Sequence, residues 1–155
     1  SAGTYAGCTM PLDITSFSLL KDRMGAVQLV AASVGAGILT TTIKDYIDRT
    51  RPEVVTQLVE VSGFSYPSGH SVAATSLYLT VAIVVSRHLQ RTTHQIAILA
   101  MTVGIILLVG MTRIYLGVHY PSDVASGISL GAAWALLLAG CFSFFPDPKT
   151  AHLWQ

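Results

Sequence analysis

Charged residues are scarce in this chain of 155 residues: Asp, Glu, Lys and Arg together make up 11% of it. A typical soluble domain contains about 25% charged residues. A soluble globule of this size needs many polar residues to cover its surface, and this composition does not supply them. The scarcity of charge therefore argues against a soluble domain. The composition also excludes the disordered, collagen-like and coiled-coil classes.

Cysteine and an excess of charge of one sign are also lacking. Cys8 and Cys141 are too few for a disulfide framework. The net charge of +1 creates no general basic field, so we expect no nucleic-acid partner. Hydrophobic residues, in contrast, make up 52% of the chain, and there are thirteen glycines. Small residues let membrane helices pack closely, so the composition predicts a helical membrane protein.

Four apolar stretches contain no Asp, Glu, Lys or Arg: residues 26–43, 71–86, 95–111 and 124–145. Each approaches the roughly 17 to 25 residues that cross a bilayer as a helix, although the second is short without its flanking residues. Each stretch could instead be a buried helix of a soluble protein, but this alternative would have to apply to all four stretches of one small chain. We therefore predict an all-α integral membrane helical bundle with four clear spans, forming a single domain over residues 1–155.

The connectors between these stretches divide between the two sides of the membrane. Residues 44–70 and 112–123 are separated by two spans, so they share one side. That side has four Lys and Arg against five acidic residues, whereas the opposite side, counted from residue 21, has five Lys and Arg against two Asp. Because positive residues favour the cytoplasmic side, we expect the two connectors to face away from the cytoplasm. Residues 1–20 show no basic segment before an apolar core and do not resemble a signal peptide.

The shared side gathers groups that suit a phosphate. Lys44, Arg51 and Arg113 can neutralise its charge, and arginine offers a two-pronged hydrogen-bond donor. Ser68 and Gly69 precede a predicted helix, where free backbone amides and the helix dipole favour an anion. These residues predict a phosphate-binding site. Taken singly, Lys44 and Arg113 could instead be interfacial anchors and Arg51 a solvated loop charge.

Two histidines and an aspartate on the same side supply the groups for catalysis. His119 and Asp123 are four residues apart, so in a helix they would share a face, with the carboxylate holding one ring nitrogen. The other nitrogen could then attack phosphorus. His70 could protonate the leaving group. Asp123 with Ser122 could alternatively cap the last helix.

The ordered pattern K-x6-R-P, P-S-G-H and R-x5-H-x3-D resembles the signature of the type 2 phosphatidic acid phosphatase superfamily. Thr112 is a mild departure from this signature, because the family usually has Ser before the arginine of the third motif. The resemblance implies hydrolysis through a phosphohistidine without a metal or other cofactor. It assigns His119 as nucleophile, Asp123 as its orienting partner and His70 as general acid. Lys44, Arg51, Ser68, Gly69, His70 and Arg113 would surround the phosphate, in an active-site loop over 44–70 and the third motif.

The resemblance also implies a six-helix core, of which the first two helices are missing or reduced to residues 1–20. It implies a lipid phosphate or pyrophosphate as partner at a bacterial inner membrane, with the site on the extracytoplasmic side. Phosphatidic acid, phosphatidylglycerol phosphate and undecaprenyl pyrophosphate are the candidate substrates; the oligomeric state is left open. Two alternatives are a catalytically silent protein that binds or transports lipid head groups and an enzyme like the vanadium haloperoxidases. The remaining charged residues and histidines, including Arg49, His88 and His94, are interpreted as solvated or interfacial.

Overall fold

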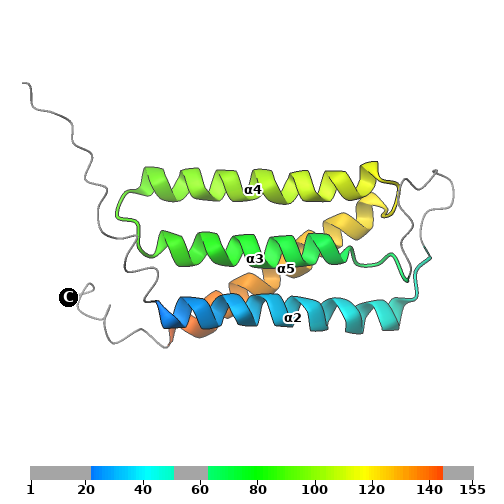
Figure 1. Ribbon diagram of the computed structural model, residues 1–155, viewed down its shortest axis with the longest axis horizontal. Helices are drawn as coiled ribbons and strands as arrows, with labels where there is room; N and C mark the ends of the chain where they lie inside the picture. The colour runs from blue at the N-terminus through cyan, green and yellow to red at the C-terminus, as the bar shows by residue number, and fades with distance from the viewer. Residues whose placement is uncertain (1–21, 51–62, 145–155) are drawn as a thin grey trace, which may run out of the picture.

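The computed structural model describes residues 22–50 and 63–144, which form four helices (Figure 1). They are α2 (Arg23–Ile47), α3 (Gly69–Ser86), α4 (Thr92–Tyr115) and α5 (Pro121–Ser143). Each is long and apolar enough to cross a membrane, and the described residues contain no strand. The predicted all-α bundle with four spans is confirmed. The predictions for residues 1–20, for Arg51 with Pro52 and for the tail with Lys149 concern parts of the chain outside this description.

Helix α3 is the centre of the bundle, because it packs against each of the other three helices. In Figure 1, α2, α3 and α4 lie side by side and α5 crosses them obliquely. The chain runs up and down, so α2 and α4 end where α3 and α5 begin, on the right of the view. This arrangement brings the residues of the three sequence motifs that the structure describes to one end of the bundle.

Two glycines let α5 approach α3 closely. A Cβ atom on Gly127 would lie 2.8 Å from the carbonyl oxygen of Ser68. One on Gly131 would lie 2.6 Å from the carbonyl oxygen of Val72. Both distances are too short for a contact between a Cβ atom and a backbone oxygen. Helix α5 can therefore approach the α3 backbone this closely only because these two positions are glycine. This contact sets the position of the first turn of α5 against the first turn of α3.

The polarity of the bundle is reversed relative to a soluble protein. Outward-facing side chains are apolar: Val30 is 63% exposed, Leu108 64% and Met111 67%. Between the helices, small polar groups form direct ties, as where Ser76 Oγ donates to the Ala32 carbonyl at 3.0 Å. Hydrogen bonds of this kind link helices in a bilayer, where lipid gives no hydrophobic force between them. Further buried polar side chains in the helices are Gln28, Ser71, Thr75, Thr80 and Thr102.

Candidate active site

The predicted site residues that the structure describes gather at the end of the bundle where α2 and α4 stop. Lys44 and Arg113 lie in the last turns of α2 and α4. His70 lies in the first turn of α3 with an exposed side chain, and Asp123 lies in the first turn of α5. His119 belongs to the short loop between α4 and α5. The prediction that the two connectors share one side is therefore confirmed.

The loop before α5 owes its shape to a few local signals. Gly117 has a φ of +69°, a backbone conformation that glycine adopts without strain, and it lets the chain turn back after α4. Pro121 occupies the first turn of α5, where its missing N–H costs nothing. The Asp123 side chain accepts the backbone N–H of Tyr120 at 3.0 Å. Asp123 thus supports the start of α5 from its third position, and the N-cap residue is Tyr120 rather than Ser122 or Asp123.

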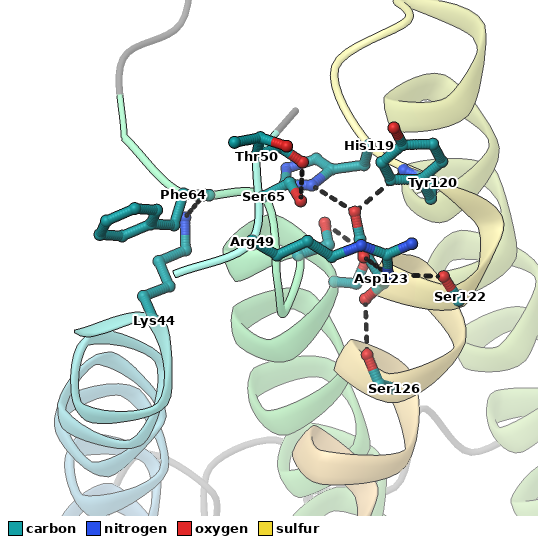
Figure 2. A network of polar contacts seen from close by, with 12 residues as sticks. Lys44, Arg49, Thr50, Phe64, Ser65, His119, Tyr120, Ser122, Asp123 and Ser126 are labelled. Carbon is teal, nitrogen blue, oxygen red and sulfur yellow. Dashed lines mark hydrogen bonds and ion pairs between the residues drawn. The ribbon is translucent and has the colours of Figure 1, made fainter. Parts of the chain in front are cut away.

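His119 and Asp123 form a buried pair. His119 Nδ1 lies 3.6 Å from Asp123 Oδ2, and the two side chains are 4% and 0% exposed. The expected pairing is present, although its basis differs from the prediction: His119 precedes the helix, and the loop rather than a shared helical face brings the ring to the carboxylate (Figure 2). The distance is slightly longer than a hydrogen bond, and such contacts commonly shorten when substrate binds. Nδ1 is therefore the ring nitrogen that faces the carboxylate.

Backbone contacts join the second motif to the third. The N–H of Ser68 donates to the carbonyl oxygen of Asp123 at 3.0 Å. Ser126 Oγ donates to the same oxygen at 3.1 Å. Ser68 is fully buried, and its hydroxyl accepts a hydrogen bond from Ser71 Oγ at 3.1 Å. Because Gly69 begins α3, the first amides of this helix and its positive dipole end lie beside the first turn of α5.

The structure places two of the three predicted phosphate-binding cations. Lys44 Nζ donates to the backbone carbonyl of Phe64 at 3.0 Å, so this lysine reaches across to the segment that leads into α3 (Figure 2). Arg113 Nε lies 3.4 Å from Thr112 Oγ1, and that hydroxyl donates to the Val109 carbonyl at 2.7 Å. Thr112, which stands where the family usually has Ser, therefore still places a hydroxyl beside the Arg113 side chain. The third cation, Arg51, lies outside the described residues.

Arg49 is the residue that sequence reasoning missed. Its Nη1 lies 2.7 Å from Asp123 Oδ1 and 2.9 Å from Ser122 Oγ (Figure 2). Its side chain is 38% exposed, so it is partly solvated, but the interpretation as solvated or interfacial does not include this pairing with a buried carboxylate. No signal in the sequence around Arg49 identifies this partner, because Asp123 lies 74 positions away.

His88 also differs from its interpretation as a solvated residue. Its Nε2 lies 3.2 Å from Asp22 Oδ2, at the opposite end of the bundle, and both side chains are 14% exposed. His94 is exposed, as expected. Among the described residues, no three His, Cys, Asp or Glu side chains group as metal ligands would.

Fold and site together define a helical membrane protein with a buried His–Asp pair among cationic side chains at one membrane boundary. The PAP2 superfamily matches residues 25–146. The chain belongs to this superfamily, which confirms the resemblance seen in the sequence motifs.

Named relatives lie in the same superfamily. The chain is 38% identical to phosphatidylglycerophosphatase B of Bacillus subtilis, over 66% of this chain and 51% of that protein. It is 32% identical to lipid A 1-phosphatase of Rhizobium johnstonii, over 82% of this chain and 56% of that protein. The chain thus spans about half the length of these relatives. The crystal structure of a transmembrane PAP2-type phosphatidylglycerolphosphate phosphatase from Bacillus subtilis matches with a TM-score of 0.76 at 30% identity, covering 87% of this chain and 68% of the other.

Proposed function

We propose that this protein is a membrane phosphatase that hydrolyses a lipid phosphate or lipid pyrophosphate through a phosphohistidine on His119. The observation that carries the proposal is the buried pair of His119 with Asp123, 3.6 Å apart, at the end of the bundle that also presents Lys44, His70 and Arg113. A histidine next to a carboxylate suits nucleophilic attack, and cationic side chains suit the phosphate that it attacks. The relatives named as phosphatases support the same chemistry.

Each step of the proposed reaction is assigned to a particular atom. His119 Nε2 attacks phosphorus, so a P–N bond forms while the bond to the leaving oxygen breaks, and His70 gives its proton to that oxygen. Asp123 faces Nδ1 and stabilises the positive charge that the ring acquires. A water molecule then attacks the phosphohistidine and passes a proton to His70, which releases inorganic phosphate and restores both histidines. Lys44, Arg113, the Ser68–Gly69 turn and Arg51 neutralise the phosphate oxygens.

The membrane position of this site explains the choice of a lipid substrate. Outward faces of α2 and α4 are apolar, so acyl or prenyl chains can remain in the bilayer while the head group reaches the end of the bundle. Relatives are named for phosphatidylglycerol phosphate and for lipid A, both of which carry phosphate on a lipid. Phosphatidic acid, phosphatidylglycerol phosphate and undecaprenyl pyrophosphate remain the candidate substrates for this chain.

Phosphate release by the purified full chain in detergent tests this function. We expect release from at least one of the three candidate lipids, inhibition by vanadate, and no release by His119→Ala. Activity should persist in EDTA, because the cationic side chains already neutralise the phosphate. A protein that binds these lipids but releases nothing would be a silent head-group binder. Loss of activity on chelation, with recovery in magnesium, would contradict the metal-independent mechanism.

We further propose that the site faces the extracytoplasmic side of a bacterial inner membrane. The net positive charge on the opposite side supports this orientation. Tyr46, which is 89% exposed near the site, and the exposed Gln90 in the loop between α3 and α4 offer labelling positions. In a chain without Cys8 and Cys141, an impermeant thiol reagent applied to intact cells should label Tyr46→Cys but not Gln90→Cys. The reverse pattern would overturn the orientation.

A further inference from the structure

The side chain of Arg49 is committed to the aspartate behind the proposed nucleophile. Its Nη1 donates to Asp123 Oδ1 at 2.7 Å and to Ser122 Oγ at 2.9 Å. Its guanidinium carbon lies 4.4 Å from the centre of the Tyr120 ring, within the range of a cation–π contact. Three contacts, with Tyr120, Ser122 and Asp123 at the start of α5, therefore fix the position of this one cation.

The two oxygens of the Asp123 carboxylate have separate partners. Oδ1 accepts from Arg49, whereas Oδ2 accepts the Tyr120 N–H at 3.0 Å and faces His119 Nδ1. The carboxylate is fully buried, and a buried charge is unfavourable unless it is paired and hydrogen-bonded. In the part of the chain that the structure describes, Arg49 is the one Lys or Arg side chain paired with it. Arg49 thus pairs with the buried carboxylate and fixes the direction of Oδ2.

The backbone around Arg49 is also held against the rest of the site. The carbonyl oxygen of Arg49 accepts the N–H of Ser65 at 2.8 Å, and Ser65 Oγ donates to the carbonyl of Thr50 at 3.0 Å. Ser65 is fully buried and lies three residues before Ser68. The arginine is consequently anchored at its main chain to the segment entering α3 and at its side chain to the start of α5.

We propose that Arg49 is a positioning residue: it orients Asp123 so that the carboxylate holds His119 for attack. This inference rests on the proposed phosphatase function. It differs from the role assigned to Lys44, Arg51 and Arg113, because Arg49 acts through Asp123 and leaves the substrate phosphate to the other cations. Its removal should weaken the nucleophile while leaving substrate binding nearly intact.

A double-mutant cycle between Arg49 and Asp123 tests this role. We expect Arg49→Gln to lower kcat by roughly 10- to 100-fold with KM changed by less than about 3-fold, the range expected when one partner of a coupled pair is removed. In the Asp123→Asn background, where no carboxylate remains to be held, the same substitution should lower kcat by less than about 3-fold. Equal losses in both backgrounds, or a raised KM with unchanged kcat, would overturn the proposal.

Two further variants separate positioning from a general loss of structure. Arg49→Lys keeps the charge without the two-pronged geometry, and should recover part of the activity that Arg49→Gln loses. If Arg49→Gln does not fold, the cycle is run with Arg49→Lys, and the same non-additivity is required. Arg91→Gln, an exposed arginine at the opposite end of the bundle, is the matched control and should leave kcat unchanged.

Orthovanadate binding, followed by vanadium NMR, gives a measurement that needs no turnover. Vanadate is bound by the same histidine nitrogen that would attack phosphorus, so Arg49→Gln should weaken binding in the wild-type background and have little further effect beside Asp123→Asn. A wild-type protein that binds vanadate with this pattern but releases no phosphate would contradict the proposed function and support the role of Arg49. Phosphate release together with an additive double-mutant cycle would support the proposed function and contradict the role of Arg49.

Discussion

The two ends of the helical bundle each carry an aspartate–histidine pair at the start of a helix. At one end, Asp22 accepts the Gly25 N–H at 2.7 Å and lies 3.2 Å from His88. At the other end, Asp123 accepts the Tyr120 N–H at 3.0 Å and lies 3.6 Å from a histidine. In both pairs the carboxylate satisfies a backbone amide and benefits from the positive end of a helix dipole. The two pairs thus share an aspartate at a helix start, although Asp22 is the N-cap residue of α2 and Asp123 is the third residue of α5.

The surroundings of the two pairs differ. Asp123 is completely buried and is paired with Arg49, whereas Asp22 is partly exposed. The nearby Arg87 donates to Gln28 Oε1 at 3.0 Å, so it is engaged by a neutral group. The pair at Asp22 therefore ties the start of α2 to the loop after α3. An aspartate–histidine contact alone therefore does not distinguish the proposed phosphatase site; the cations and the second histidine assigned to the Asp123 end do.

Removing each histidine in turn gives the largest expected difference between the ends. His119→Ala should lower turnover by at least about 1,000-fold, as loss of a nucleophile does in other covalent mechanisms. His88→Ala should remain within about 3-fold of wild type, because His88 lies at the end of the bundle opposite the proposed site, away from the reacting groups. Both variants are compared with wild type by their turnover and by the amount of phosphoenzyme that can be trapped with labelled substrate. Label persisting on His119→Ala would remove that histidine from its assigned role.

His70, the second histidine at the site end, sharpens the comparison, because His94, which lies at the Asp22 end in the first turn of α4, has no role in the proposed reaction. His70→Ala should slow hydrolysis of a lipid phosphate by about 100-fold or more, the usual size of general acid catalysis. The same variant should slow hydrolysis of a substrate with an acidic leaving group, such as a nitrophenyl phosphate, much less. The phosphoenzyme should still form from that substrate. Equal losses on both substrates would show that His70 does not protonate the leaving oxygen.

Much of the fold follows from the sequence, and the differences have physical causes. Apolar runs without charge predict the four spans, but α2 and α4 continue beyond their runs to include Lys44 and Arg113. Long side chains of this kind remain helical at a membrane boundary because their charged ends reach water. Hydropathy therefore locates a span more securely than it locates the ends of its helix.

The site was predictable where its chemistry depends on local spacing, and less so where it depends on tertiary contact. The short separation of His119 from Asp123 limits how far apart they can be, and the motif order brought the remaining groups to the same side. Arg49 pairs with a residue 74 positions away, and nothing in its own segment reveals that partner. The interior position of Gln28 is likewise set by which face of α2 meets α3 and α5.

The contact between α3 and α5 supports the site end more than the other, and it predicts a stability effect of intermediate size. Gly131→Val should lower the free energy of unfolding by about 1 to 3 kcal/mol, because its side chain would displace the α3 backbone. Gly140→Ala is the matched control: a Cβ there has no neighbour within 4 Å, so stability should hold or rise by up to about 1 kcal/mol. Apparent Tm in detergent distinguishes them; equal shifts would contradict the close approach.

The smallest expected effect is at Asp22, and it tests whether the two ends are independent. Asp22→Ala removes the cap on Gly25 and the contact with His88, so stability should fall by about 1 kcal/mol without a change in turnover. Asp22→Asn retains a capping oxygen and loses only the charge, so it should cost roughly half as much or less. Asp123→Asn, the equivalent change at the site, should abolish most activity. If Asp22→Ala lowered kcat as severely as Asp123→Asn does, the Asp22 pair would belong to the catalytic machinery, and the distinction between a structural tie and a reactive pair would fail.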